Sequence, residues 1–599
     1  MDNTDEIKTR VQGKVDNNFD EANIKEKDAD QSNQVIDYDT LVSAAGEFGL
    51  YQVFLTFCTF PFYAFGVFAY FGQLFLTEPS PNHWCLVPEL RNLTALDRRI
   101  LAIPPDRDAR FGYSQCEMYA ANWTDVLRTG ATPNETWSTQ PCLHWEFNNT
   151  EIPYPTITSE LGWVCDKASY QATAQAIFFV GSVTGGFIFG WLCDRFGRIP
   201  AAVTSNVTGC LAGIGSIFAS NLLQFSISRF FMGMSYDSCM MMTYILVLEF
   251  VAPKYRSLMA NLPFGIFYSL AATALPWIAL ACGHWKTLSL VMSLPMALAL
   301  LTPLMVPESP KWLLIKGRID EAANQIVRIA RVNGKEVPAK LIEQFKASAR
   351  KTEPVPSRSL LDLATRPLLR NTLIFLCIEY MCCMIIFDAL VRILGSLQFD
   401  FFVSFTLVSL TECPSLVLIS FILDLTGRKW LTILCFLVCC ACCSLSIFVS
   451  SGLPSVLCAV IARFAVNITL NTAYQWGAEM LPTTVRGSAI SFIHICGFVA
   501  SIVSPYIVYL ENYMTWLPLV VICVIALLGA ASALALPETA GRVMPQSFEE
   551  AEALNRDQTF FDVPCLRRKY VLLVGCCNGY KRQLLHAEIR PGRNVFSNT

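Results

Sequence analysis

The chain has 599 residues, of which 53% are hydrophobic and only 16% charged, and its mean hydropathy is +0.42. A soluble protein carries about a quarter charged residues, so much of this apolar surface must face something other than water. The formal net charge is −3, with no basic stripe for nucleic acid. The 24 cysteines lie mostly in apolar runs and the five histidines form no cluster, so we expect no metal and no other cofactor.

Residues 1–48 are polar and lack the apolar core of a cleavable signal peptide, so we expect a disordered cytoplasmic tail.

Twelve later runs have the roughly 20 apolar residues that a helix needs to cross a bilayer. They are 51–76, 170–193, 201–220, 222–248, 258–281, 287–306, 371–394, 401–423, 431–450, 454–477, 488–510 and 516–536. The sequence therefore predicts an all-α membrane protein with twelve transmembrane helices. Two six-helix halves, 49–306 and 371–540, are joined by a cytoplasmic linker, 307–370, and followed by a cytoplasmic tail, 541–599.

Short loops on one side of the predicted membrane carry most of the basic residues. These are Arg195, Arg198, Lys254, Arg256, Arg428, Lys429 and Arg486. The opposite turns near Asn221, Gly452 and Asn512 contain no Lys or Arg, and the turn near His284 has Lys286. Because cytoplasmic loops are enriched in Lys and Arg, both termini are predicted to be cytoplasmic.

Residues 77–168, between the first two runs, are then extracellular. N-glycosylation sequons start at Asn92, Asn122, Asn134 and Asn148. Two more sequons, at Asn206 and Asn467, fall in or beside spans, where we expect no glycan. The same segment carries Cys85, Cys116, Cys142 and Cys165. An even number of cysteines in an oxidising compartment predicts two disulfides, with three possible pairings, and free thiols are the alternative.

An internal repeat relates the two halves at a shift of 230 positions. The motif that begins at Asp194 and ends at Arg198 recurs from Asp424 to Arg428. The same shift relates the further pairs Glu249 and Glu479, Arg256 and Arg486, and Glu308 and Glu538. Internal repeats of this kind are typical of secondary transporters, whose halves rock about a site near the bilayer midplane.

The repeated acids and bases lie at the cytoplasmic ends of helices in both halves. We interpret them as a gate, whose members pair across the halves when the inner side is shut and separate when it opens. The gate residues are Asp194, Arg198, Glu249, Arg256, Glu308, Asp424, Arg428, Glu479 and Arg486. Alternatively, they fix the topology and form surface salt bridges, each of which contributes little.

Several motifs resemble known transporter families. Gly190-Trp-Leu-Cys-Asp-Arg-Phe-Gly-Arg198 resembles the signature loop of the major facilitator superfamily, and Pro307-Glu-Ser-Pro-Lys-Trp-Leu313 a run of its sugar-transporter and organic-ion branches. The narrower resemblance is to the organic cation, organic anion and carnitine transporter family. It is carried by residues 140–148, 163–167, 479–486 and 536–539. This resemblance covers about residues 40–545 and implies the major facilitator fold at the plasma membrane. That family often has six loop cysteines, where this chain has four.

Ionisable residues inside membrane spans are costly and are candidates for function. Asp237 lies in the fourth run, Asp388 in the seventh, Glu412 in the eighth and Arg463 in the tenth. The resemblance implies that spans one, four, seven and ten line the central cavity. Acids and a base facing one cavity suit a substrate with an amine and a carboxylate. Alternatively, Arg463 neutralises Asp237 or Asp388, and Glu412 is a packing or gating acid.

Aromatic residues could supply ring faces for a cationic group. Tyr380, Phe387 and Tyr474 are candidates, although each could instead serve in packing. In the family that the chain resembles, a position of span eleven is typically acidic in cation carriers and basic in anion carriers. This position is Phe498 here, which implies that the cation-type charge has moved to Asp388 or Asp237.

We therefore expect alternating-access transport of a small organic cation or zwitterionic amine, such as a carnitine-like compound or an amino-acid-derived amine. An organic anion transporter is the alternative. With no phosphate-binding glycine loop, an ATP-driven pump or other enzyme is not expected. A transport-inactive receptor or scaffold of the same fold is a different class, and the intact motifs of both halves argue against it. The expected partners are a small-molecule substrate and membrane lipid, without nucleic acid. A coupling ion is possible but unknown, so that facilitated diffusion, sodium symport and proton exchange are all open.

Overall fold

The computed structural model of the chain describes residues 38–106, 111–134, 137–351, 360–396, 399–449, 452–542 and 544–556. Most of the two predicted tails, residues 1–37 and 557–599, lies outside the described residues. The chain divides into two compact units. One comprises Met1–Cys58, Ile245–Met259 and Val306–Val355, and the other Thr59–Tyr244, Ala260–Met305 and Pro356–Thr599.

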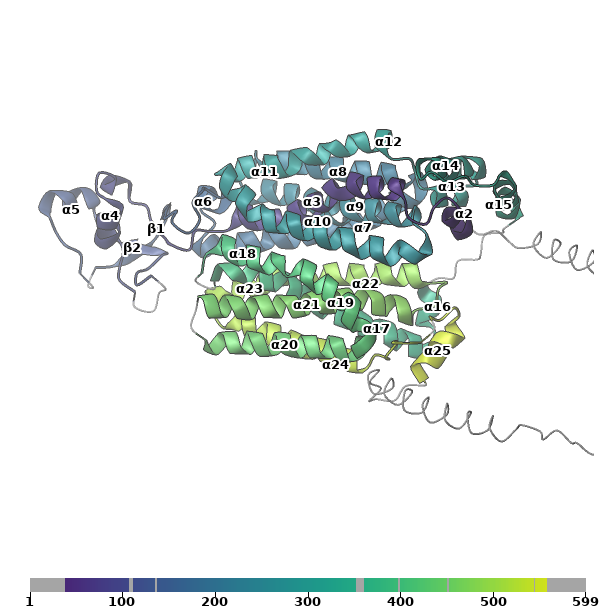
Figure 1. The fold of residues 1–599 in the computed structure, drawn as a ribbon. Helices are drawn as coiled ribbons and strands as arrows, with labels where there is room; N and C mark the ends of the chain where they lie inside the picture. The colour runs from purple at the N-terminus through teal and green to yellow at the C-terminus, as the bar shows by residue number, and fades with distance from the viewer. Residues whose placement is uncertain are drawn as a thin grey trace, which may run out of the picture. The chain divides into compact units, whose positions relative to one another are not determined.

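Long helices make up most of the chain (Figure 1), and most of them lie in the second unit. By residue range, parts of α3, α9 and α10 belong to the first unit. The first half contains α3 (Leu50–Thr77), α7 (Ser169–Phe196), α8 (Arg198–Ser216), α9 (Leu222–Glu249), α10 (Pro253–Cys282), α11 (Trp285–Ser293), η3 (Leu294–Leu301) and α12 (Thr302–Met305). The second half contains α17 (Pro367–Arg392), η4 (Ile393–Ser396), α18 (Phe401–Leu410), α19 (Glu412–Thr426), α20 (Arg428–Phe448), α21 (Leu453–Met480), α22 (Arg486–Ser501), α23 (Ser504–Tyr509), η5 (Leu510–Asn512) and α24 (Leu517–Leu534). Within this unit α7 packs against α22 and α23, so the two halves are in contact.

Helices cover all twelve predicted runs. In the described part of the chain, eleven helical segments are long and apolar enough to cross a membrane. The remaining helix, α8, lies at the expected third position, but polar residues such as Ser205 and Asn206 lower its hydropathy. Three predicted runs are interrupted at Pro295, Pro414 and Pro505, because proline lacks the amide proton that a continuous helix requires.

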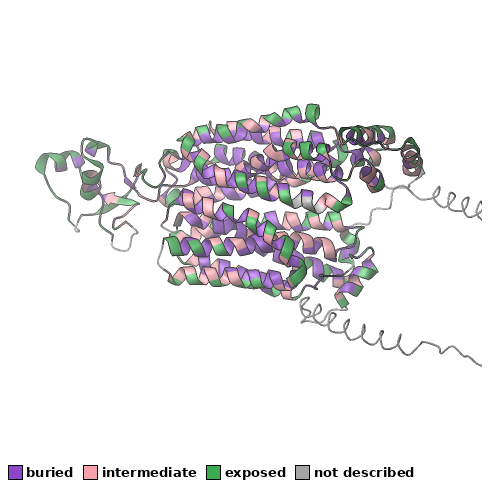
Figure 2. Ribbon diagram, viewed as in Figure 1, coloured by how far each residue is buried: buried purple, intermediate pink, exposed green. Residues whose placement is uncertain are grey.

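Exposed positions lie along the long helices (Figure 2), and many of them are large apolar residues. Phe187, Phe218, Leu304, Phe421 and Phe448 are each more than 60% exposed. Such a surface would be a liability in water but is the normal outer face of a bundle surrounded by lipid tails. The protein is therefore a multi-pass membrane protein.

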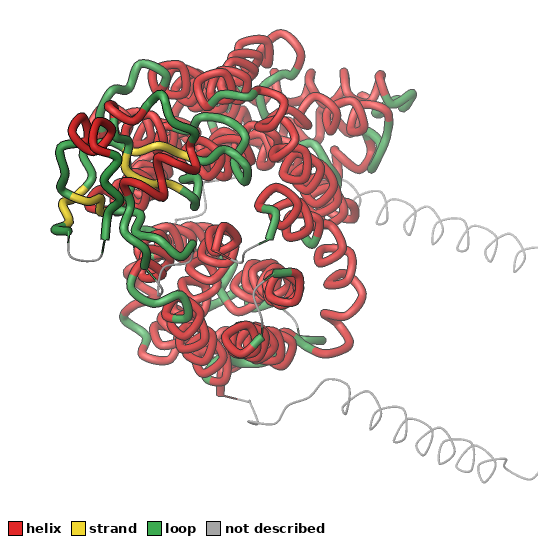
Figure 3. The backbone as a smooth tube through the Cα atoms, turned by 90° about the vertical axis from the view of Figure 1, so that its left-hand side faces the viewer, coloured by secondary structure: helices red, strands yellow, loops and turns green. Residues whose placement is uncertain are grey.

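The predicted insertion, residues 77–168, folds into short elements with its own core, and Figure 3 shows its strands among loops. The strands are β1 (His83–Cys85), paired antiparallel with β4 (Trp145–Phe147), and β2 (Glu117–Tyr119), paired antiparallel with β3 (Thr139–Pro141). The helices are η1 (Pro88–Leu90), α4 (Ala95–Ala102), α5 (Trp123–Thr129), α6 (Ile157–Leu161) and η2 (Cys165–Lys167). Buried Trp84, Leu90 and Trp123 belong to its core.

All four insertion cysteines are paired, Cys85 with Cys142 and Cys116 with Cys165, which selects one of the three possible pairings. Asn92, Asn122 and Asn134 of the predicted sequons are exposed and Asn148 is half-buried. Asn206 and Asn467 are fully buried, in agreement with the expectation that they carry no glycan.

The first unit contains an ordered part of the predicted N-terminal tail. The helix α2 (Tyr38–Ala44) packs in a core with α14, and the Tyr38 hydroxyl donates to the carbonyl oxygen of Glu249 at 2.5 Å. The expectation of a disordered tail is therefore wrong for residues 38–48, because Leu41 and Val42 bury apolar side chains. The linker forms α13 (Pro310–Ile315), α14 (Ile319–Val332) and α15 (Ala339–Lys351) in this unit, while α16 (Leu360–Ala364) and the C-terminal α25 (Phe548–Arg556) belong to the second.

The disulfide pairing gives a direct test of the insertion. Non-reducing proteolysis followed by mass spectrometry should yield cross-linked peptides joining Cys85 to Cys142 and Cys116 to Cys165. In a Cys116→Ser variant, Cys165 should become alkylatable while the peptide linking Cys85 and Cys142 persists. Recovery of a peptide joining Cys85 to Cys116 would contradict this fold of the insertion.

Candidate functional site

Asp388 lies on α17 and is held by two partners. Its side chain is 2% exposed, and Arg392, one turn further along the helix, donates from Nε to Oδ2 at 2.7 Å and from Nη2 to Oδ1 at 3.0 Å. The Tyr70 hydroxyl of α3 donates to Oδ1 at 2.8 Å. The charge of Asp388 is thus neutralised within its own helix by a bidentate guanidinium, the strongest form of such a pair.

Arg463, on α21, does not pair with Asp237 or Asp388 as the sequence suggested. Its Nη2 donates to Glu412 Oε1 at 2.8 Å, Nη1 donates to the carbonyl oxygen of Phe387, and the guanidinium lies 3.3 Å from the centre of the Phe387 ring. Arg463 is 1% exposed and Glu412 7%. The pair links α19 to α21, so this geometry favours the interpretation of Glu412 as a packing acid.

Asp237 differs from the other two predicted acids. It lies on α9 and is half-buried, and in the part of the chain that the structure describes its carboxylate has no ion-pair partner. It lies close enough to Tyr380 and Tyr474 to interact with them electrostatically. A carboxylate in a membrane-spanning helix without a fixed cation is poised to accept a mobile one.

An aromatic cluster surrounds this part of the bundle. The Tyr380 hydroxyl donates to that of Tyr474 at 2.8 Å, and the His494 ring stacks on Tyr380 with centroids 5.3 Å apart. Tyr236, the neighbour of Asp237 in the chain, contacts the Phe498 ring edge to face at 6.0 Å. Phe498 is 6% exposed, so the position at which the resemblance implied a charged residue forms part of an aromatic wall.

Sequence reasoning missed several buried polar residues. Arg392 was hidden inside an apolar run, although its spacing of four residues from Asp388 is a helical ion-pair signal. Arg229, on α9, is 2% exposed and donates to Gln73 Oε1 at 2.8 Å and to the Ala69 carbonyl oxygen at 3.1 Å. Glu379, on α17, is fully buried, and neither carboxylate oxygen has a hydrogen-bond partner among the described residues.

The repeated arginines make the same bonds in both halves. Arg198 Nη1 donates to the Cys193 carbonyl oxygen at 3.4 Å, and Arg428 Nη1 donates to that of Leu423 at 3.4 Å. In each motif the intervening glycine, Gly197 (φ 115°) or Gly427 (φ 84°), lies in the region that favours glycine. Each arginine therefore satisfies a carbonyl at the end of the preceding helix.

The second repeated pair follows the same rule. Arg256 Nε donates to the Val251 carbonyl oxygen at 3.2 Å, and Arg486 Nε donates to that of Leu481 at 3.2 Å. Arg256 also forms an ion pair with Asp39. The predicted repeat thus extends to identical hydrogen bonds at helix ends.

The gate acids form pairs within each half. Asp194 lies 3.6 Å from Arg198, Asp424 lies 2.9 Å from Arg428, and Glu479 lies 2.8 Å from Arg428. The Glu308 carboxylate accepts from its neighbour's amide, Ser309 N, at 2.9 Å, while Glu249 is 9% exposed.

Glu538, the repeat partner of Glu308, is fully engaged. Its two oxygens accept the amide protons of Arg428 and Lys429 at 3.0 Å each, and it is 1% exposed. A carboxylate at the first amides of α20 is stabilised by the unpaired N–H groups and by the helix dipole.

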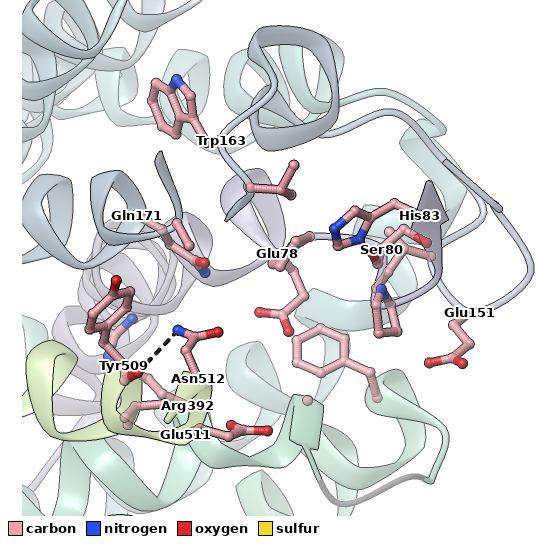
Figure 4. A pocket seen from close by; sticks show the side chains of 18 of the residues that line it. Glu78, Ser80, His83, Glu151, Trp163, Gln171, Arg392, Tyr509, Glu511 and Asn512 are labelled. Atoms are coloured by element: carbon pink, nitrogen blue, oxygen red, sulfur yellow. Dashed lines mark hydrogen bonds between the residues drawn. The ribbon is translucent and has the colours of Figure 1, made fainter. Parts of the chain in front are cut away.

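A cavity of about 1030 Å³ lies at the end of the bundle that carries the insertion (Figure 4). Arg392, the partner of Asp388, lines it together with Glu78, Gln171, Tyr509 and Glu511. Burial, then the nearby Glu511 carboxylate, raises the pKa of Glu78 to about 8. The cavity is as large as those that bind small organic molecules.

The Arg463–Glu412 pair predicts a measurable loss of stability. Replacing Glu412 by Leu leaves the Arg463 charge buried without its partner, which should lower the free energy of unfolding by about 3–5 kcal/mol. The double variant E412L/R463M should recover much of this loss. Unfolding in detergent, followed by tryptophan fluorescence, measures both. The matched control, Glu336→Leu at an exposed loop position, should change the free energy of unfolding by less than about 0.5 kcal/mol. If E412L changed the free energy of unfolding by no more than this control does, the pair would contribute nothing to stability.

Comparison with solved structures shows the fold. The inward open conformation of the xylose transporter XylE from E. coli superposes with a TM-score of 0.51 at 19% identity, covering 65% of this chain and 89% of that one. A second structure, the major facilitator superfamily proton:xylose symporter XylE bound to 6-bromo-6-deoxy-D-glucose, gives a TM-score of 0.50 at 19% identity, over 65% of this chain and 90% of that one. The predicted major facilitator fold is confirmed.

Relatives in sequence are transporters. The Drosophila melanogaster proteins named carcinine transporter and beta-alanine transporter are each 28% identical over 548 residues, covering 88% and 87% of this chain and 81% and 90% of the relatives. Human solute carrier family 22 member 2 is 28% identical over 549 residues, covering 86% of this chain and 95% of its own. The prediction that the chain is not an enzyme is confirmed by these matches. A family profile described as "Sugar (and other) transporter" matches residues 117–553, and the chain belongs to this family.

Proposed function

We propose that this protein is a secondary transporter that moves a small organic cation or zwitterionic amine across the plasma membrane by alternating access. Asp237 carries the proposal. Of the predicted intramembrane acids, Asp388 and Glu412 are bound to Arg392 and Arg463, whereas the Asp237 carboxylate has no ion-pair partner among the described residues. It is the acid best placed to neutralise the ammonium group of a substrate.

The surrounding groups support an amine. Tyr380 and Tyr474 lie within electrostatic range of Asp237, and Phe498 contacts the neighbouring Tyr236. Aromatic faces attract cations within about 6 Å. Asp388, Phe387, Arg463 and Glu412 hold the helices that frame this region. Two of the relatives are named for carcinine and β-alanine, and a further Drosophila melanogaster relative, 28% identical over 529 residues, is named organic cation transporter protein.

Orientation follows from charge. With basic loops on the cytoplasmic side, both termini are cytoplasmic, and the insertion with its four sequons and two disulfides is extracellular. The large cavity then opens on the extracellular side. The repeated helix-end residues form the proposed cytoplasmic gate. In this structure Arg428 forms ion pairs with Asp424 and Glu479, all within the second half.

An anionic substrate is the second candidate, and one observation favours it. Arg229 donates to the neutral acceptors Gln73 and Ala69, and the described residues include no carboxylate within ion-pair distance of it. A substrate carboxylate could neutralise this buried guanidinium. Comparing uptake of amines, β-amino acids and organic anions in proteoliposomes distinguishes the two candidates.

The amine site predicts a contrast between two aspartates. Asp237→Asn should reduce amine uptake at least about 100-fold in kcat/KM, because a buried ammonium loses its counter-charge, while thermal stability changes little. Asp388→Asn should lower stability, because it leaves Arg392 buried and unpaired. Radiolabelled uptake into proteoliposomes, with thermal unfolding of the same preparations, separates the two effects. Wild-type uptake kinetics in Asp237→Asn would rule out this carboxylate as the amine ligand.

The gate predicts a change in accessibility without a change in stability. The Asp194 side chain is 87% exposed, so its pair with Arg198 contributes little in the present geometry. If Asp194 also pairs when the inner side is shut, Asp194→Asn should bias the carrier towards inward opening. Labelling of Asn512→Cys at the cavity by an impermeant thiol reagent, measured above the background of native cysteines, should then fall. A rise in labelling would contradict the gate.

A further inference from the structure

The cavity at the insertion end brings together segments that are far apart in the sequence. Glu78 follows α3, Gln171 and Gln175 lie on α7, Arg392 ends α17, and Glu511 lies in η5. Figure 4 shows Glu78 and Glu511 extending into the cavity from different elements. A ligand here would therefore contact both halves of the transporter as well as the insertion.

Carboxylates dominate the ionisable lining. Glu78, Glu151, Asp400 and Glu511 line the cavity against the single guanidinium of Arg392, whose charge is already neutralised by the bidentate pair with Asp388. His83 also lines it, and burial lowers its pKa, so it is neutral at physiological pH. The lining therefore offers more carboxylates than cationic groups, and it favours cations once Glu78 is deprotonated.

Gln175 gives an independent sign of a missing ligand. It lines the cavity, is 1% exposed, and neither Oε1 nor Nε2 has a hydrogen-bond partner among the described residues. A buried amide with no partner costs free energy, and such groups in native structures are usually satisfied by water or a ligand. A polar molecule in the cavity would meet this requirement.

We propose that this cavity is a second cation-binding site, which holds an organic ammonium ion between Glu78, Glu511 and the amide of Gln175 before transfer to Asp237. The proposal rests on the proposed function. It adds an outer site at which the transported amine first loses part of its hydration shell. Gln175 Oε1 accepts an N–H of a primary or secondary ammonium, and the two carboxylates supply the counter-charge. The site is selective for amines with an N–H group.

Titration of Glu78 supplies a signature of this site. Glu511 on η5, Arg392 on α17 and Gln171 on α7 act on Glu78, while His83, Glu151 and Asp400 line the same cavity. Protonated Glu78 offers no counter-charge. Raising the pH through about 8 therefore strengthens cation binding, and a bound cation in turn favours the deprotonated carboxylate.

Equilibrium binding of radiolabelled tetraethylammonium to the full-length protein in nanodiscs tests the proposal, because the charge of this probe does not depend on pH. Its affinity should rise about 20-fold between pH 6.5 and 8.5, since deprotonation of a carboxyl changes by up to tenfold per pH unit. Glu78→Gln copies the neutral carboxyl, so it should fold normally, remove most of this rise and weaken binding at pH 8.5 by at least about 20-fold. Glu511→Gln should shift the rise to lower pH, because it removes a neighbouring negative charge.

A second pair of measurements isolates the amide. Gln175→Met keeps the volume of the side chain, and should weaken binding of butylammonium about 10- to 100-fold, the value of one hydrogen bond to a charged group. The same variant should leave tetraethylammonium unchanged, because that ion has no N–H. Glu117→Gln, an exposed carboxylate of the insertion outside the cavity lining, should behave as wild type in every assay.

The outcomes separate this site from the transport proposal. Wild-type affinity and pH dependence in both Glu78→Gln and Glu511→Gln would overturn the cavity site, even if the protein transports amines through Asp237. Failure of every amine to enter proteoliposomes, with tetraethylammonium still bound in a Glu78-dependent manner, would overturn the transport function but retain the site. Equal loss of both probes in Gln175→Met would also count against the amide as an N–H acceptor.

Discussion

Charges inside the bilayer are costly unless they are neutralised or hydrogen-bonded where they lie, and this cost organises much of the bundle. An isolated ion in a membrane-spanning helix costs several kcal/mol, so Arg463 and Asp388 each tie a helix to a neighbour, whereas Asp237 and Glu379 are the described exceptions. Arg463 joins α21 to Glu412 on α19 and to the backbone of α17. Asp388 joins α17 to Tyr70 on α3, so a single carboxylate connects the second half to the first.

The internal repeat shows the same rule at helix ends. An arginine five residues beyond a carbonyl recurs at equivalent positions of both halves and makes the same bond each time. A helix that ends at the membrane surface leaves carbonyls without partners, and a nearby guanidinium satisfies them. The same arginines could therefore serve both the proposed gate and the predicted topology.

Much of the fold follows from one-dimensional patterns. The helix order, the two halves and the insertion could be predicted from span length, charge bias, sequons and the 230-residue shift. Each of these signals depends only on position along the chain. The sequence patterns did not predict which buried charged side chains pair with each other. Helices that are apolar on all sides give no periodic signal for which face turns inward, so the alignment of Arg463 with Glu412 rather than Asp388 depends on helix rotations that only packing decides. Gln175 was missed for the same reason. In contrast, the spacing of four residues between Asp388 and Arg392 and the prolines at Pro414 and Pro505 were available signals.

A continuous set of contacts connects the outer cavity with the candidate amine site. Arg392 lines the cavity and binds Asp388, Asp388 accepts from Tyr70, and Tyr70 stacks on Tyr236 with centroids 5.0 Å apart, next to Asp237 in the chain. Under the proposed function, Asp388 is a structural residue rather than an amine ligand, because its charge is already paired with Arg392. An unpaired Asp388 would compete with Asp237 for the cation, so the bidentate pair would favour release of the substrate.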